Sequence, residues 1–200
     1  MSAVNAFSVV LRRLQSAALI AAFVCLPLAL RADDTAVPMS IQVELMLKVA
    51  AYDKNLAARA AGRVRLLVLV KRDVADSGRS AAQALKALAN TDTVIGLPLE
   101  SLVVPYTDAA SLAKFAADNR ASIVYVMPGF EANEMEAMAA ALTGMDVLSV
   151  GALAKYAARG TVIGFDLAGG KPKLLVHLGQ AKKQNVELSS SVLKLMRVIE

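Results

Sequence analysis

The residues of this sequence that could take part in catalysis are few and lie far apart. His177 is the only histidine, and it lies between Val176 and Leu178 in a run typical of a strand. A histidine that acts as a general base or a zinc ligand needs partner residues. Because the sequence has no second histidine and only one distant cysteine, we expect His177 to have a structural or surface role.

The serines and glycines also fit structural roles better than catalytic ones. Ser189, Ser190 and Ser191 precede an apolar run, where serine is a preferred helix N-cap, and no activating base lies near them in the sequence. The glycines between residues 160 and 170 lie around a predicted strand pair, not in the strand-to-helix loop that cradles a phosphate. These features argue against an enzyme and against nucleotide binding, and we expect no cofactor.

The first 32 residues are typical of a secretory signal peptide. A positive start at Arg12 and Arg13 is followed by an apolar run over residues 17–30 and by a site for cleavage after Ala32. The run is shorter than the ~20 residues that span a membrane, which favours cleavage over retention as an anchor. Cleavage would remove Cys25, the only cysteine, so the mature protein would have no disulfide. We therefore predict a periplasmic protein.

The charge balance argues against a nucleic-acid partner. The sequence has 22 Lys and Arg against 17 Asp and Glu, a net charge of +5. The predicted signal peptide holds three arginines and no acid, so the mature chain has 19 minus 17, or +2, which is close to neutral. A basic group near the C-terminus is either a solvated surface or a site for an acidic partner or anionic lipid; its members are Lys171, Lys173, Lys182, Lys183, Lys194 and Arg197.

Strand-like and helix-like runs alternate along the mature chain. Strands are predicted at residues 64–70, 102–105, 122–126 and 146–150, and helices at 40–52, 77–89, 108–119 and 131–142. Asp108 is expected to cap its helix, with Leu112 and Phe115 facing inward. This order implies parallel strands joined by crossover helices. The predicted fold class is therefore α/β, a single domain over residues 39–200 with an open, mostly parallel sheet flanked by helices.

Four methionines lie on or beside the helix predicted at 131–142. Methionine fills irregular gaps in cores and also forms adaptable binding surfaces, and a core role is the more common one. Met135 and Met138 are flanked by Glu134 and Glu136, so we expect this pair to be the more exposed. The other two are Met127 and Met145.

The C-terminal segment predicts an antiparallel hairpin followed by a final amphipathic helix. Residues 161–167 and 173–178 are rich in strand formers, and Gly169 and Gly170 can adopt the positive φ of a tight hairpin turn. Residues 179–183 predict a short helical turn. The final helix is expected after the three serines, with one apolar face made by Val192, Leu193, Leu195, Met196 and Ile199.

The order of these parts resembles a family signature over about the last quarter of the chain. Five segments follow one another in a fixed order. They are a strand at 147–150, a strand at 160–165 that begins with glycine, the glycine turn with its basic residue, the alanine-lysine segment at 181–183 and the serine-rich segment at 188–195. In this order they resemble the C-terminal signature of the YfiR family, the YfiR/HmsC-like periplasmic regulators. The matching positions are Gly160, Ile163, Phe165, Gly170, Lys173, Ala181, Ser190 and Leu193. One departure is His177-Leu178-Gly179, where the family usually has an asparagine.

The resemblance implies a non-enzymatic regulator that binds the periplasmic region of an inner-membrane sensor. That sensor would be a diguanylate cyclase or a histidine kinase, held inactive by binding, with effects on cyclic diguanylate and biofilm. The resemblance also makes a homodimer an expectation. An alternative is a periplasmic small-ligand-binding domain, because open α/β sheets bind ligands at the carboxyl ends of their strands. The loops after Val70, Pro105, Met127 and Val150 are the expected place for such a site.

Overall fold

The computed structural model describes residues 37–200, which lie in one compact unit. The predicted signal peptide lies outside the described residues. Within residues 37–200, no helix combines the length and the apolar character that crossing a membrane requires.

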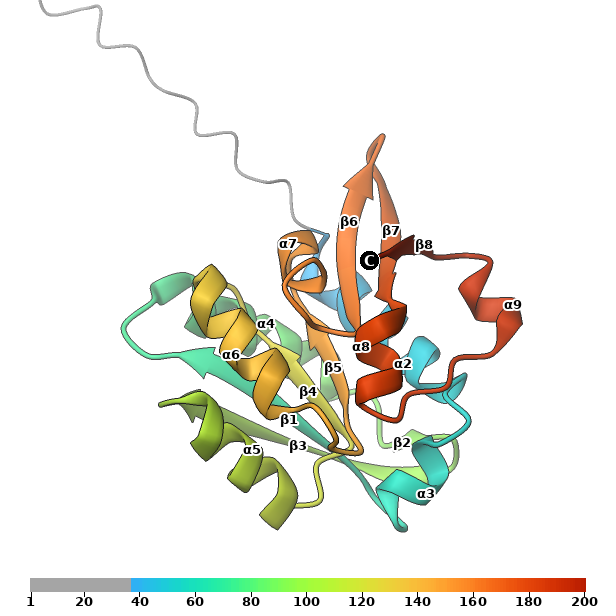
Figure 1. Ribbon diagram of the computed structural model, residues 1–200, viewed down its shortest axis with the longest axis horizontal. Coiled ribbons are helices and arrows are strands. Elements are labelled where there is room, and N and C mark those ends of the chain that lie inside the picture. The colour runs from blue at the N-terminus through green and yellow to red at the C-terminus, as the bar shows by residue number, and fades with distance from the viewer. Residues whose placement is uncertain (1–36) are drawn as a thin grey trace, which may run out of the picture. The chain divides into compact units, whose positions relative to one another are not determined.

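One sheet of eight strands runs through the described residues in the order β2-β3-β1-β4-β5-β6-β7-β8 (Figure 1). The strands from β3 to β6 in this order are parallel, β2 and β7 are antiparallel to their inner neighbours, and β8 is parallel to β7. The predicted α/β fold class is confirmed. The strands are β1 Val64–Lys71, β2 Thr93–Val94, β3 Leu97–Tyr106, β4 Ile123–Val126, β5 Leu148–Gly151, β6 Ile163–Ala168, β7 Lys171–His177 and β8 Arg197–Ile199.

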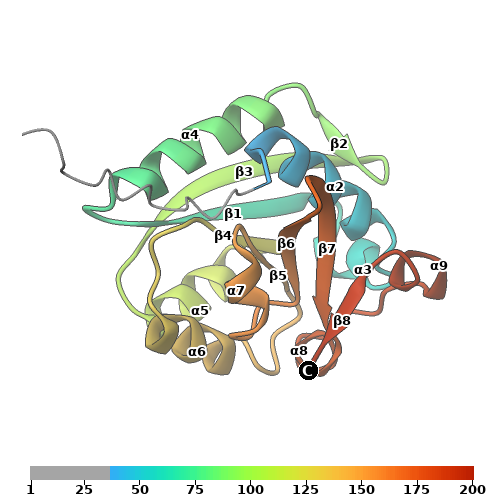
Figure 2. The same cartoon turned by 90° about the horizontal axis from the view of Figure 1, so that it is seen from above.

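Helices cover both faces of the sheet (Figure 2). One face carries α2 (Met39–Ala51) and α4 (Ala75–Leu88), and the other carries α5 (Ala109–Asp118), α6 (Ala132–Ala141) and α7 (Ala154–Ala157). The short helices α3 (Leu56–Ala60), α8 (Leu178–Lys183) and α9 (Ser190–Leu193) lie toward the β8 end of the sheet. The crossover helices therefore bury both faces of the central strands, which is why β1 is apolar almost throughout.

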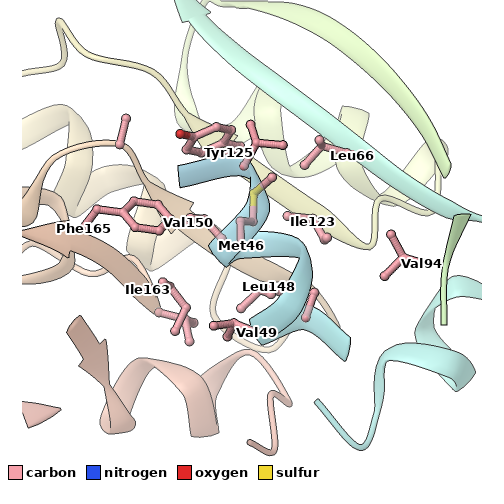
Figure 3. Packing of buried hydrophobic residues seen from close by; sticks show 14 of the residues in the cluster. Met46, Val49, Leu66, Val94, Ile123, Tyr125, Leu148, Val150, Ile163 and Phe165 are labelled. Carbon is pink, nitrogen blue, oxygen red and sulfur yellow. The ribbon is translucent and has the colours of Figure 1, made fainter. Parts of the chain in front are cut away.

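The larger core lies between α2 and the sheet (Figure 3). Met46 and Val49 of α2 pack toward the strands that carry Leu66, Ile123 and Leu148, and all five side chains are at most 2% exposed. Such burial is the main favourable contribution to folding. The core on the opposite face is made largely by α5, α6 and the other side chains of the same strands.

Two sequence-based expectations about α5 and α6 were wrong. Met135 and Met138 are 1% and 2% exposed, because they lie on the side of α6 that packs against the sheet. On α5, Asp108 caps as predicted and accepts a 2.8 Å hydrogen bond from the Ser111 amide, but Phe115 is 38% exposed. Ala116 is buried instead, since it follows Leu112 by four residues and shares its face.

The predicted hairpin is confirmed as β6 and β7. Gly169 and Gly170 have φ of 58° and 75°, as a two-residue hairpin turn requires. A second hairpin, β2–β3, was missed by the sequence analysis. It turns at Ile95 and Gly96, with φ of 50° and 78°, and β3 is a ten-residue strand where only residues 102–105 were predicted.

The predicted final helix is also corrected. Only Ser190–Leu193 is helical, and Arg197–Ile199 forms β8 beside β7. Val192 and Met196 are buried, whereas Leu195 is 68% exposed. The five apolar residues of the predicted helix face are therefore not all buried. The serines do not cap through their side chains, because the Ser189 hydroxyl hydrogen-bonds the Ser191 hydroxyl.

Candidate functional site

His177 lies at the end of β7 and holds the start of α8. Its Nδ1 accepts a 3.2 Å hydrogen bond from the Gln180 amide, which makes His177 the N-cap of α8. This agrees with the structural role expected from the sequence. Within residues 37–200, no group of three or more histidine, cysteine, aspartate or glutamate side chains is placed to hold a metal ion.

The loops named as a possible ligand site do come together at one edge of the sheet. The chain passes from β1 to β3 on one side and then crosses to β4 on the other side of β1. The carboxyl ends of β1 and β4 are therefore the topological switch point, where open α/β sheets bind ligands. The loops after Val70, Pro105, Met127 and Val150 all leave the sheet at this edge.

Several side chains contact one another at this edge. Lys71, at the end of β1, forms a 2.5 Å ion pair with Glu134 of α6, and its Nζ lies 5.9 Å from the centre of the Phe130 ring. Phe130 also meets Tyr106 edge to face, with ring centres 5.2 Å apart. The Tyr156 hydroxyl accepts a 2.9 Å hydrogen bond from the Phe130 amide. These contacts join the ends of β1, β3 and β4 to the helices that follow.

Two loops approach each other closely at the switch point. Gly129 has φ of 109°, and a Cβ placed there would lie 2.8 Å from Cγ1 of Val74. Only glycine lets the loop after β4 pack this closely against the loop after β1. A cavity of about 100 Å³ lies near Tyr106 and Phe115, and this cavity is smaller than the ~300 Å³ of a typical small-molecule pocket.

Tyr106, Tyr156 and Glu134 at this edge have shifted pKa values. Burial raises the pKa of the Tyr106 hydroxyl, and the nearby Glu134 and Asp108 carboxylates raise it further. Burial likewise raises the pKa of Tyr156. For Glu134, burial alone would raise the pKa, but the hydrogen bond from the Glu131 amide and the Lys71 ion pair outweigh it, so the pKa is lowered. Glu134 is therefore ionised at neutral pH.

The eight signature positions are spread over the C-terminal third of the domain. Ile163 and Phe165 of β6 are buried, and the Phe165 ring meets Tyr125 edge to face at 6.5 Å. Gly160 has φ of 112° and packs against Ala139 of α6. Gly170 is in the hairpin turn, Lys173 is exposed on β7, Ala181 is buried on α8, and Ser190 and Leu193 begin and end α9. They do not form one cluster.

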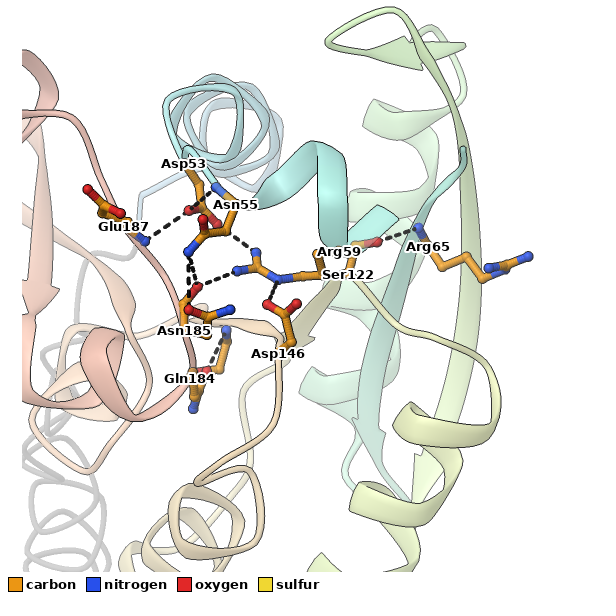
Figure 4. Close-up of polar contacts among 10 residues, drawn as sticks. Asp53, Asn55, Arg59, Arg65, Ser122, Asp146, Gln184, Asn185 and Glu187 are labelled. Atoms are coloured by element: carbon orange, nitrogen blue, oxygen red, sulfur yellow. Dashed lines mark hydrogen bonds and ion pairs between the residues drawn. The ribbon is translucent and has the colours of Figure 1, made fainter. Parts of the chain in front are cut away.

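A buried ion-pair network, centred on Arg59, was not foreseen from the sequence (Figure 4). The Arg59 and Asp53 side chains are 1% and 0% exposed, and Nη1 lies 2.6 Å from Asp53 Oδ2. Arg59 Nε donates to Asp146 at 2.7 Å, and Nη2 donates to the Asn185 carbonyl at 2.9 Å. One guanidinium thus contacts three residues, two of them 87 and 126 residues away in sequence, through the several donors that lysine lacks.

Asp53 extends the network to the segment between α8 and α9. Its Oδ1 accepts hydrogen bonds from the Asn55 and Glu187 amides, at 3.1 and 2.9 Å, and Asp53 forms an isolated antiparallel bridge with Leu188. Each oxygen of this buried carboxylate therefore has donors, as a buried charge requires. The segment from Asn185 to Leu188 is fixed in place by these contacts.

A groove of about 360 Å³ lies beside this segment, between α8 and α9. Leu178, Ala181 and Lys182 of α8 line one side, and Leu193 of α9 contributes to another. The remaining lining residues are Asn55, Asn185, Val186, Glu187 and Leu188.

The basic residues near this end of the chain are mostly unpaired. Thirteen lysines and arginines lie between residues 37 and 170, and nine of them form an ion pair within residues 37–200. Six lysines and arginines follow residue 170, and of these only Arg197 forms an ion pair within the described residues, with Asp166. The unpaired positive charge of the described chain is thus concentrated in its last 30 residues.

The fold and these sites define an open α/β domain with several side-chain contacts at its usual ligand edge. The chain belongs to the YfiR/HmsC-like family, whose family model matches residues 42–197. A comparison with curated protein sequences finds no match.

Solved structures share the fold at low sequence identity. An ABC domain in complex with L-Trp from Streptococcus pneumoniae is 16% identical with a TM-score of 0.54, over 81% of this chain and 62% of that one. A conserved domain protein from Vibrio cholerae is 13% identical with a TM-score of 0.58, over 82% and 60%. An open, ligand-free substrate-binding protein with adhesive properties from Clostridium difficile is 10% identical with a TM-score of 0.54, over 74% and 58%. The chain thus covers 58–62% of the length of these structures.

Proposed function

We propose that this protein is a non-enzymatic periplasmic regulator that binds the periplasmic region of an inner-membrane sensor and represses it. The sensor is a diguanylate cyclase or a histidine kinase, and repression lowers cyclic diguanylate and biofilm matrix. Membership of the YfiR/HmsC-like family across almost the whole described domain carries this proposal. The signal-like pattern of residues 1–32 supports export.

The mechanism is a shift in the population of sensor states. A regulator that binds the inactive state more tightly than the active one moves the equilibrium toward the inactive state. A shift from 1:99 to 99:1 needs about 10⁴-fold tighter binding to the favoured state. Such discrimination requires a protein surface that fits one sensor conformation, so the regulator itself needs no catalytic group.

The alternative is a small-ligand-binding domain. One structure with the same fold is described as a complex with L-Trp and another as a substrate-binding protein, but at 10–16% identity this likeness concerns the fold alone. At the edge where such a ligand would bind, Lys71 lies over the Phe130 ring and Gly129 packs against Val74. We take these close contacts to favour protein binding. A thermal-shift screen with amino acids and sugars that stabilised the protein would favour the alternative.

Deletion of the gene in its own host tests the proposal. We expect intracellular cyclic diguanylate or kinase output to rise, and complementation with the full chain to reverse the rise. A chain without residues 1–32, which would stay in the cytoplasm, is the matched control and should not complement. Unchanged output after deletion, together with no membrane sensor cross-linked to the exported protein, would contradict the proposal.

A further inference from the structure

The groove between α8 and α9 has a wall that is already fixed in position. The segment from Asn185 to Leu188 is held by the Arg59 hydrogen bond to the Asn185 carbonyl and by the Asp53 hydrogen bond from the Glu187 amide. A surface ordered before binding loses less conformational entropy when a partner docks. The groove is therefore better suited to binding a partner than a surface whose backbone must first become ordered.

The groove combines apolar side chains with unpaired positive charge. Leu178 is 43% exposed although it lines the groove, and Leu193 is partly exposed opposite it. Lys182 also lines the groove and has no acidic partner within residues 37–200, whereas the acid in the lining, Glu187, is paired with Lys54. Lys194 follows Leu193 in the chain and is likewise exposed and unpaired within those residues.

We propose that this groove binds an acidic amphipathic segment of the partner protein, with apolar side chains against Leu178 and Leu193 and carboxylates facing Lys182 and Lys194. This inference rests on the proposed regulatory function and assigns it a surface. Removing the leucines from water supplies affinity, and the lysines supply orientation and selection against basic segments.

A protein segment fits this surface better than a lipid membrane does. Recognition of anionic lipid headgroups uses clusters of about four to eight basic residues on an exposed face. Here one unpaired lysine, Lys182, lines a concave, partly apolar groove, and Lys194 follows the lining residue Leu193 in the chain. Lys171 lies at the β6–β7 turn, at the other end of β7 from α8. The charge is too sparse for a membrane surface and is suited to one or two carboxylates.

Peptide selection tests the surface without knowledge of the partner. The exported protein is purified and used to select binders from a random peptide library displayed on phage. We expect enrichment of peptides that combine Asp or Glu with Leu, Ile or Phe. Leu178→Asp and Lys182→Glu should each weaken binding of a selected peptide by about tenfold or more. Val103→Asp and Lys171→Glu make the same changes at exposed positions away from the groove and should alter binding less than about twofold.

The outcomes separate this inference from the proposed function. Selected peptides without acidic residues, or equal affinities for groove and control variants with unchanged urea unfolding, would overturn the groove assignment. Lys182-dependent sedimentation with phosphatidylglycerol vesicles, without peptide binding, would replace the protein partner by a lipid. In the deletion strain, Lys182→Glu should fail to restore repression where Lys171→Glu restores it. If the deletion itself has no effect, the proposed function fails whatever the peptides show.

Discussion

The Tyr125 hydroxyl of β4 donates a 2.7 Å hydrogen bond to the Gln42 side-chain oxygen of α2, and both residues are 0% exposed. The Gln42 side-chain nitrogen in turn donates to the Val37 carbonyl at 2.7 Å. Burial raises the pKa of Tyr125 far above its ordinary value, so the hydroxyl remains a donor at neutral pH. This chain of bonds fixes the register of α2 on the sheet inside an otherwise apolar core.

Tyr125→Phe should destabilise the protein by about 1–3 kcal/mol, because the buried Gln42 oxygen loses its donor. Urea unfolding of Tyr125→Phe, Gln42→Leu and the double variant measures the coupling free energy between the two side chains. We expect the double variant to cost less than the sum of the two single changes. Additive costs would show that the hydrogen bond contributes nothing specific.

The two carboxylates that contact Arg59 should differ in their effect on stability. Asp53→Asn leaves a guanidinium buried beside a neutral group and should cost about 3 kcal/mol. Asp146→Asn should cost about 1 kcal/mol or less, because Asp146 is 46% exposed. Asp118→Asn, which breaks the exposed pair with Lys114, is the control and should have almost no effect on the free energy of unfolding. Equal costs at residues 53 and 146 would contradict the assigned burial.

The Lys71–Glu134 pair should contribute acid sensitivity. The pKa of Glu134 is lower in the folded protein than its ordinary value of 4.5, so its contribution to stability is present above that value and is lost as the pH falls through the lower folded pKa. Glu134→Gln should be less stable than wild type at neutral pH by about 1 kcal/mol or less. The unfolding free energies of wild type and Glu134→Gln should converge as the pH is lowered below the ordinary pKa of glutamate. A difference between them that did not change with pH would be evidence against the Lys71–Glu134 ion pair.

Gly160 should tolerate no side chain. Gly160→Ala places a Cβ 2.3 Å from Cβ of Ala139, at φ of 112°, and should cost several kcal/mol, on the order of 3. Gly144→Ala, with φ of 81° and open space around it, isolates the backbone strain and should cost about 1 kcal/mol. Adding Ala139→Gly to Gly160→Ala should recover the part due to the clash. Identical thermal stabilities for the two single variants would refute the close packing.

Much of the fold could be predicted from local pattern, because buried parallel strands and amphipathic helices leave strong signals. The run at residues 64–70 predicted β1, and the Gly169–Gly170 turn predicted the β6–β7 hairpin. The end of the chain was misjudged for a physical reason. Val192 and Met196 are spaced as on a helix, but the backbone of Arg197–Ile199 pairs with β7, a tertiary contact that no local spacing encodes.

The sites were less predictable than the fold. His177 was expected to be structural, and its cap on α8 agrees. The sequence analysis assigned no role to Asp53, although it is the most fully paired carboxylate of the buried network. The only signal available was an acid near an arginine six residues later, a spacing that does not place two side chains on one helix face.

The Arg59 network also bears on how the chain acquires its structure as it is made. Arg59 lies 87 residues before Asp146 and 126 before Asn185, so a growing chain that has reached only β4 carries a guanidinium with few of its final partners. Stable burial of this group has to wait until the segment after α8 has emerged. We therefore expect this network to be completed late in the folding of the domain. A chain that must remain unfolded to pass through a membrane pore would benefit from this delay.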